Sequence, residues 1–293
     1  MVSIQPNKMK VIYRTLRLIT GGIFVCILIP VASKILFIKP VILFITDDTE
    51  LSKNIAAPLT TLIMVITYYF FFKLIEKREV TELDIRHLPK SLVFGFLLGF
   101  GLISMVVFTL YILGNYTIVS INSLRVLSSP LLLFVVMGIW EEIIFRGIIF
   151  RIVENALGTI YALVISSVIF SVVHFSNTGF NLVSSIAIVL ELGILTGIVF
   201  SITRNIWYPI FLHIGWNFAF VFYGITVSGA DELNTFIEGN LTGPAVITGG
   251  DFGPENSLIT ILLSVIVFAI LYLRKKLFDD QGIFEKIYEK NLS

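Results

Sequence analysis

The sequence predicts an all-α membrane protein, a polytopic bundle of about eight transmembrane helices. Three observations predict it. Of the 293 residues, 56% are hydrophobic and only 14% are charged, whereas a soluble globular chain carries about 25% charged residues. The mean hydropathy is +0.94. Apolar runs long enough to cross a bilayer recur along nearly the whole chain. The chain therefore lacks the polar side chains that a water-facing surface of this size needs.

Each predicted helix is an apolar run that approaches the roughly 20 residues needed to cross the hydrocarbon core. Polar or glycine-rich stretches separate them, notably the charged run 76–79 and the acidic stretch 229–255. The spans are expected at Leu18–Phe37, Ala57–Leu74, Leu92–Leu113, Leu131–Phe150, Ile160–Phe175, Leu182–Ile202, Ile206–Tyr223 and Leu258–Leu273. No long polar stretch remains for a separate module, so residues 1–293 are predicted to form a single membrane domain.

Lysine and arginine flank alternate ends of these spans, which predicts the orientation because basic loops remain cytoplasmic. With eight crossings the basic clusters all fall on one side, and stretch 229–255 on the other side holds none. Both termini are therefore predicted to be cytoplasmic in a multi-pass protein of the cell membrane. A cleaved signal peptide ending near Ser33 is the alternative for the first span, but the apolar run continues through Phe37.

Charge and cysteine content exclude several functions. A net charge of +1 gives no general attraction to nucleic acid. The single cysteine, Cys26, rules out an intrachain disulfide framework and a cysteine-based metal site.

The fourth span carries charges that do not belong in lipid. Glu141, Glu142 and Arg146 lie within an otherwise apolar run, and each ionised group at the bilayer centre costs about 2.5 to 3.5 kcal/mol. These side chains must therefore face protein or a wet cavity. Glu142 and Arg146 are four residues apart and can pair on one helix face, while Glu141 points about 100 degrees away. The spacing predicts one neutralised glutamate and one free glutamate, although an ion pair that only fixes packing remains the alternative.

Two later spans add polar side chains. His174 lies four residues after Phe170, and His213 lies four residues before Asn217, so each pair shares one helix face. A histidine alone is more often a packing residue. Two imidazoles, a carboxamide, two carboxylates and an arginine on three spans instead indicate a site.

These groups suit hydrolysis of an acyl bond by activated water. A carboxylate can take a proton from water, a histidine can share it, and a second histidine with an asparagine can stabilise an oxyanion. No serine is convincingly paired with a base. Zn²⁺ bound by Glu141, His174 and His213 is the alternative, but the helix motif with two histidine ligands on one face is missing, so no cofactor is required.

The ordered motifs, Glu141-Glu142 with Arg146, then Phe170 with His174, then His213 with Asn217, resemble those of the CPBP family of membrane proteins. This family includes CAAX proteases and bacteriocin-processing proteins and is also called the Abi or type II CAAX prenyl endopeptidase group. The resemblance covers residues 130–223.

The resemblance implies a hydrolase, a membrane endopeptidase with an intramembrane site. It implies that Glu141 activates water with help from His174. It further implies that His213 and Asn217 stabilise the oxyanion, while Glu142 and Arg146 support the first motif. The substrate is expected to be a peptide or a membrane protein. The compact chain and basic flanks look bacterial, where prenylated substrates are not expected.

Two other functions remain open. A proton-coupled transporter could use the same ionisable groups as a relay, and a catalytically silent bacteriocin-immunity or scaffold protein could share the fold. Glu191 lies in the middle of the sixth span and belongs to none of the three motifs. It is either a neutral hydrogen-bond donor near the site or a packing contact.

Overall fold

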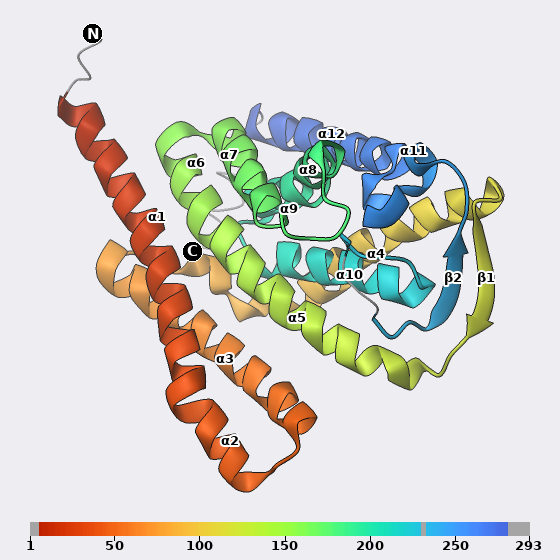
Figure 1. Ribbon diagram of the computed structural model, residues 1–293. Helices are drawn as coiled ribbons and strands as arrows, with labels where there is room; N and C mark the ends of the chain where they lie inside the picture. The colour runs from red at the N-terminus through yellow and green to blue at the C-terminus, as the bar shows by residue number, and fades with distance from the viewer. Residues whose placement is uncertain (1–5, 230–232, 281–293) are drawn as a thin grey trace.

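The computed structural model of the protein describes residues 6–229 and 233–280, which are mostly helical. The predicted single domain over 1–293 also includes residues 1–5, 230–232 and 281–293, which lie outside the described residues. Figure 1 shows a bundle of helices with a small antiparallel sheet of two strands at one end. The predicted all-helical fold is thus confirmed except for this small sheet, whose short strands were not expected.

The predicted apolar runs are helical apart from a few end residues, but the first two helical segments begin earlier than predicted, at Pro6 and Thr49. Local signals explain several starts: the Asp48 carboxylate accepts hydrogen bonds from the backbone N–H groups of residues 50 and 51, and the Asn181 side chain caps the helix after it. The elements are α1 (Pro6–Ser33), α2 (Lys39–Ile45), α3 (Thr49–Phe71), α4 (Leu88–Ile112), β1 (Tyr116–Ile121), α5 (Ser128–Glu142), α6 (Arg151–Leu157), α7 (Thr159–Val172), α8 (Leu182–Ile188), α9 (Ile194–Thr203), α10 (Trp207–Tyr223), β2 (Ile237–Leu241), α11 (Ala245–Thr248) and α12 (Leu258–Asp280).

Wider π-helical turns join some of these helices end to end. Lys34–Ile38 links α1 to α2, Ile143–Phe150 links α5 to α6, and Val189–Gly193 links α8 to α9. Such turns are rare and occur often at functional sites. The second and third of them carry or adjoin the charged residues of the predicted site.

Five helical ranges among the described residues are long and apolar enough to cross a membrane: Val11–Ile45, Thr49–Glu76, Thr81–Ile112, Leu182–Thr203 and Leu258–Leu277. These ranges indicate a multi-pass membrane protein. The count of eight crossings stays a prediction. The other three predicted spans are helical as well, but α7 has 14 residues, α10 has 17, and α5 ends in two glutamates.

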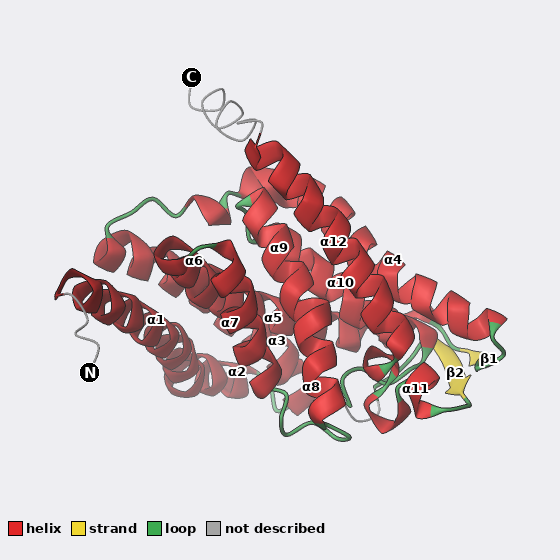
Figure 2. Ribbon diagram, turned by 90° about the horizontal axis from the view of Figure 1, so that it is seen from above, coloured by secondary structure: helices red, strands yellow, loops and turns green. Residues whose placement is uncertain are grey.

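Helix α10 lies in the middle of the bundle (Figure 2), and most of its residues are buried. Its most extensive helix contact is with α4, and it also packs on α5 and α9. Helices α1 and α3 pack together at one side of the bundle, where α3 also touches α5 (Figure 1). The two helices that carry most of the predicted site, α5 and α10, are therefore held from both sides.

Backbone contact between α4 and α10 depends on glycine. A Cβ atom at Gly99 would lie 2.0 Å from the Leu212 carbonyl oxygen, which no real Cβ tolerates. Gly101, two residues further along α4, has no heavy atom within 4 Å of such a position. Gly99 thus lets the two helices approach closely.

We expect Gly99→Ala to lower the thermal unfolding midpoint of the detergent-purified protein strongly, because α4 must move away from α10. Gly101→Ala is the matched control, and it should leave the midpoint unchanged or raise it, since alanine favours a helix over glycine by about 1 kcal/mol. Fluorescence-detected size-exclusion chromatography after heating measures both. Equal midpoints for the two variants would contradict the assigned contact.

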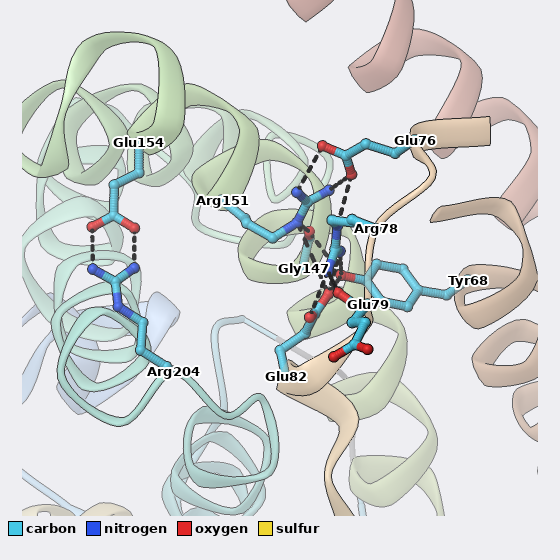
Figure 3. Close-up of polar contacts among 9 residues, drawn as sticks. All are labelled: Tyr68, Glu76, Arg78, Glu79, Glu82, Gly147, Arg151, Glu154 and Arg204. Atoms are coloured by element: carbon cyan, nitrogen blue, oxygen red, sulfur yellow. Dashed lines mark hydrogen bonds and ion pairs between the residues drawn. The ribbon is translucent and has the colours of Figure 1, made fainter. Parts of the chain in front are cut away.

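A buried ionic network fixes the far end of the helix that carries Glu141 (Figure 3). Arg78 pairs with Glu76 and Glu82, with closest N–O distances of 2.8 and 2.5 Å. Arg151 pairs with Glu76 at 2.9 Å, and its Nε donates to the Gly147 carbonyl oxygen at 2.9 Å. The network therefore ties α3 and the segment after it to the α5–α6 helix.

Candidate intramembrane catalytic site

A buried ion pair lies at the junction of α5 and α10. The Glu142 Oε1 atom is 3.2 Å from Arg146 Nη1 and 2.9 Å from His213 Nδ1, and Glu142 and Arg146 are fully buried. The spacing of four residues had predicted the first contact. The second joins the first motif to the third, because Glu142 is on α5 and His213 is on α10. Glu142 is thus the neutralised glutamate of the pair.

Arg146 has further partners on a third element. Its Nη2 atom donates to the carbonyl oxygens of Leu192 at 3.2 Å and Gly193 at 2.8 Å, where the π-helical turn leaves backbone acceptors. Its guanidinium carbon lies 4.8 Å from the centre of the Phe170 ring, within cation–π range. Arg146 therefore holds together α5, the α8–α9 turn and α7.

The Phe170 ring lies close to both histidines. Its ring centre is 4.9 Å from that of His174 and 6.0 Å from that of His213. The His174 Nδ1 atom is 2.9 Å from the Phe170 carbonyl oxygen. A carbonyl only accepts, so Nδ1 carries the proton and, in the neutral ring, Nε2 keeps its lone pair. The Nε2 atom of His174 can therefore accept a hydrogen bond or a proton.

The four residues predicted to be catalytic line one cavity of about 310 Å³: Glu141, His174, His213 and Asn217. The Glu141 Oε2 atom lies 3.8 Å from His213 Nε2, just beyond hydrogen-bond distance. Glu142 and Arg146, predicted as supporting residues, do not line the cavity but form an ion pair next to its lining residues Glu141 and His213. The side chains come from α5, from α10 and from the turn after α7, because α7 ends at Val172 and His174 lies beyond it rather than inside the predicted span. They meet in one chamber that also has apolar walls, including Phe134 and Leu192.

The loop between α10 and α12 contributes wall residues that the sequence did not single out. Glu255 lines the cavity, accepts a hydrogen bond from Trp216 Nε1 at 2.7 Å, and accepts two from Ser228 at 2.6 and 2.5 Å. Asn177, after α7, also lines the cavity. The sequence of stretch 229–255 is typical of a polar loop. No sequence pattern predicts that the end of this stretch, at Glu255, packs against the site.

Metal ligation finds no support in this geometry. Among the described residues, no three histidine, cysteine, aspartate or glutamate side chains are grouped closely enough to hold a metal ion. Glu141, His174 and His213 line the same cavity, but they do not form such a group. The residues present therefore do not fit the zinc alternative.

Comparison with known proteins gives one match. Residues 123–219 match the profile of the family described as Rce1-like type II CAAX prenyl endopeptidases. This range contains all three motifs and confirms the resemblance that they predicted. No curated protein and no solved structure matches the chain.

Proposed function

We propose that this chain, whose residues 123–219 form an Rce1-like type II CAAX prenyl endopeptidase family domain, hydrolyses peptide bonds inside the membrane with water activated by Glu141. The family is one of endopeptidases. The observation that carries the proposal is the single cavity lined by Glu141, His174, His213 and Asn217. A peptide or a membrane protein is the proposed substrate.

The first step is proton transfer from water. The Glu141 carboxylate takes the proton, and the free Nε2 of His174 accepts a hydrogen bond from the same water. The resulting hydroxide attacks the carbonyl carbon of the scissile bond and forms a tetrahedral oxyanion. Glu141 then returns the proton to the leaving amine, and the C–N bond breaks.

The oxyanion receives hydrogen bonds from the Asn217 carboxamide and from His213. Because Nδ1 of His213 faces Glu142, a proton at Nε2 makes the ring an imidazolium. The buried Glu142 carboxylate stabilises that positive charge, and Arg146 in turn holds the carboxylate in place. Donors fixed before the reaction stabilise the oxyanion without reorganisation.

We also propose eight crossings with both termini in the cytoplasm. All eight predicted ranges lie within helical segments except for a few end residues. Most residues of α10 are buried, and α5 packs on α10 with Glu142 buried between protein groups, which explains how polar residues on these helices are tolerated.

His174→Ala tests the function together with the need for metal. The purified protein is incubated in detergent with a mixed peptide library, and new peptide ends are mapped by mass spectrometry. We expect cleavage at defined bonds, unchanged by a chelator and reduced about 100-fold or more in the variant, which loses the Nε2 acceptor. Cleavage that survives in His174→Ala would contradict the assignment. Loss with chelator and recovery with zinc would overturn the metal-free mechanism.

A further inference from the structure

Glu191 is a buried carboxyl group that the proposed mechanism does not use. It lies in the π-helical turn between α8 and α9, where its own backbone departs from helix (φ −95°, ψ −108°). The residue is 1% exposed, and its Oε1 atom has no hydrogen-bond partner among the described residues. Glu191 nevertheless lines the same cavity as Glu141 and His174. A polar atom left without a partner costs free energy unless something else satisfies it.

The neighbouring groups of the protein do not satisfy it. Arg146 donates to the carbonyl oxygens of Leu192 and Gly193, next to Glu191 in sequence, rather than to its carboxyl group. Glu255 is also acidic and already accepts three hydrogen bonds. Glu191 is thus the carboxyl group of this cavity that has neither a partner nor a role in the reaction.

The charge of the cavity wall indicates what could bind there. Glu141, Glu191 and Glu255 line it, together with two histidines, and no lysine or arginine of the described part of the chain does. A wall of this kind attracts a cation and rejects an anion. A lysine or arginine side chain would also bring several N–H donors to the unpartnered oxygen.

We propose that Glu191 is a specificity-determining residue that binds a basic side chain of the peptide substrate, lysine or arginine, close to the scissile bond. This inference rests on the proposed peptidase function. It adds a preference that the reaction itself does not require, because Glu141, His174, His213 and Asn217 act on the peptide bond whatever the neighbouring side chain is.

Matched peptides test the preference. The sequence cleaved best in a library is made with lysine, norleucine or glutamate at each position flanking the bond, and every peptide is N-acetylated so that the side chain is the sole added cation. At one position we expect kcat/KM for lysine to exceed that for norleucine by about 10- to 100-fold. Glu191→Gln should bring this ratio close to one while it cleaves the norleucine peptide at nearly the unmodified rate.

Glu50→Gln is the matched control, because Glu50 is an exposed carboxylate at the start of α3, and it should keep the preference. A ratio that Glu191→Gln leaves unchanged would overturn the inference. So would an equal loss for both peptides, which indicates packing or a neutral hydrogen bond to the substrate backbone.

A binding measurement separates failure of this inference from failure of the peptidase function. Fluorescently labelled lysine and norleucine peptides are titrated against Glu141→Gln and against the double variant Glu141→Gln/Glu191→Gln. We expect tighter binding of the lysine peptide, by about 10-fold or more, only when Glu191 is present. If no peptide is cleaved but the lysine peptide still binds more tightly, the proposed peptidase function is contradicted and the role of Glu191 is not. Equal binding of both peptides to Glu141→Gln would contradict the role of Glu191.

Discussion

Glu141→Gln is expected to lower peptide cleavage by about 100- to 10,000-fold, the range over which a general base contributes. The amide has almost the same shape as the carboxylate but cannot take a proton from water. Because Glu141 lies at the cavity wall and its side chain is partly exposed, the variant should fold like the unmodified protein. Cleavage rates of the library-derived peptide and unfolding midpoints measure the two effects separately.

Glu50→Gln removes a carboxylate of the same size outside the cavity and serves as the control. It should cleave at the unmodified rate. Glu141→Gln that cleaves as fast as this control would remove the general base from the mechanism. A catalytically silent scaffold protein, the alternative left open by the sequence, would show no cleavage in either variant.

Arg146→Met is expected to have the largest effect on folding. The substitution leaves the Glu142 carboxylate without its cation and the carbonyl oxygens of Leu192 and Gly193 without a donor, all in the buried interior. Breaking a buried ion pair by removing one partner costs about 3 to 5 kcal/mol. We expect little folded protein and a strongly lowered unfolding midpoint for what remains.

Arg86→Met is the corresponding surface variant. The Arg86 side chain is 87% exposed and pairs with Asp84, and such pairs contribute about 0 to 1 kcal/mol. Its midpoint should therefore stay close to that of the unmodified protein. An Arg146→Met protein as heat-stable as Arg86→Met would show that Arg146 does not hold the three helices together.

The sequence motifs predicted much of the site because the residues of each motif lie only a few positions apart in the chain. Glu142 and Arg146 pair as the interval of four residues predicts. The Phe170 and His174 rings are also in contact, although α7 ends at Val172 and His174 lies in the turn after it. We could also expect these helices to pack together, because charged side chains that faced lipid would cost free energy. The specific link between Glu142 and His213 is a tertiary contact between residues 71 positions apart, and no periodicity predicts it.

Other features follow from tertiary structure alone. Glu255 reaches the cavity because its loop folds back against Trp216 and Ser228, whereas its sequence neighbours are glycine and proline, as in any polar connection. The two-stranded sheet pairs residues 116–121 with 237–241, more than 100 positions away. Long-range pairing of this kind leaves no signal in a short window of sequence.

The close approach at Gly99 constrains how the protein can change. Leu212, whose carbonyl oxygen faces that glycine, directly precedes His213 in the chain. Two backbones in contact leave no layer of adaptable side chains between them, so α10 cannot slide toward α4 to make room for a bulkier ligand. Variants with altered preferences should therefore arise by exchanging wall residues such as Met137 or Leu233, while the imidazole keeps its position.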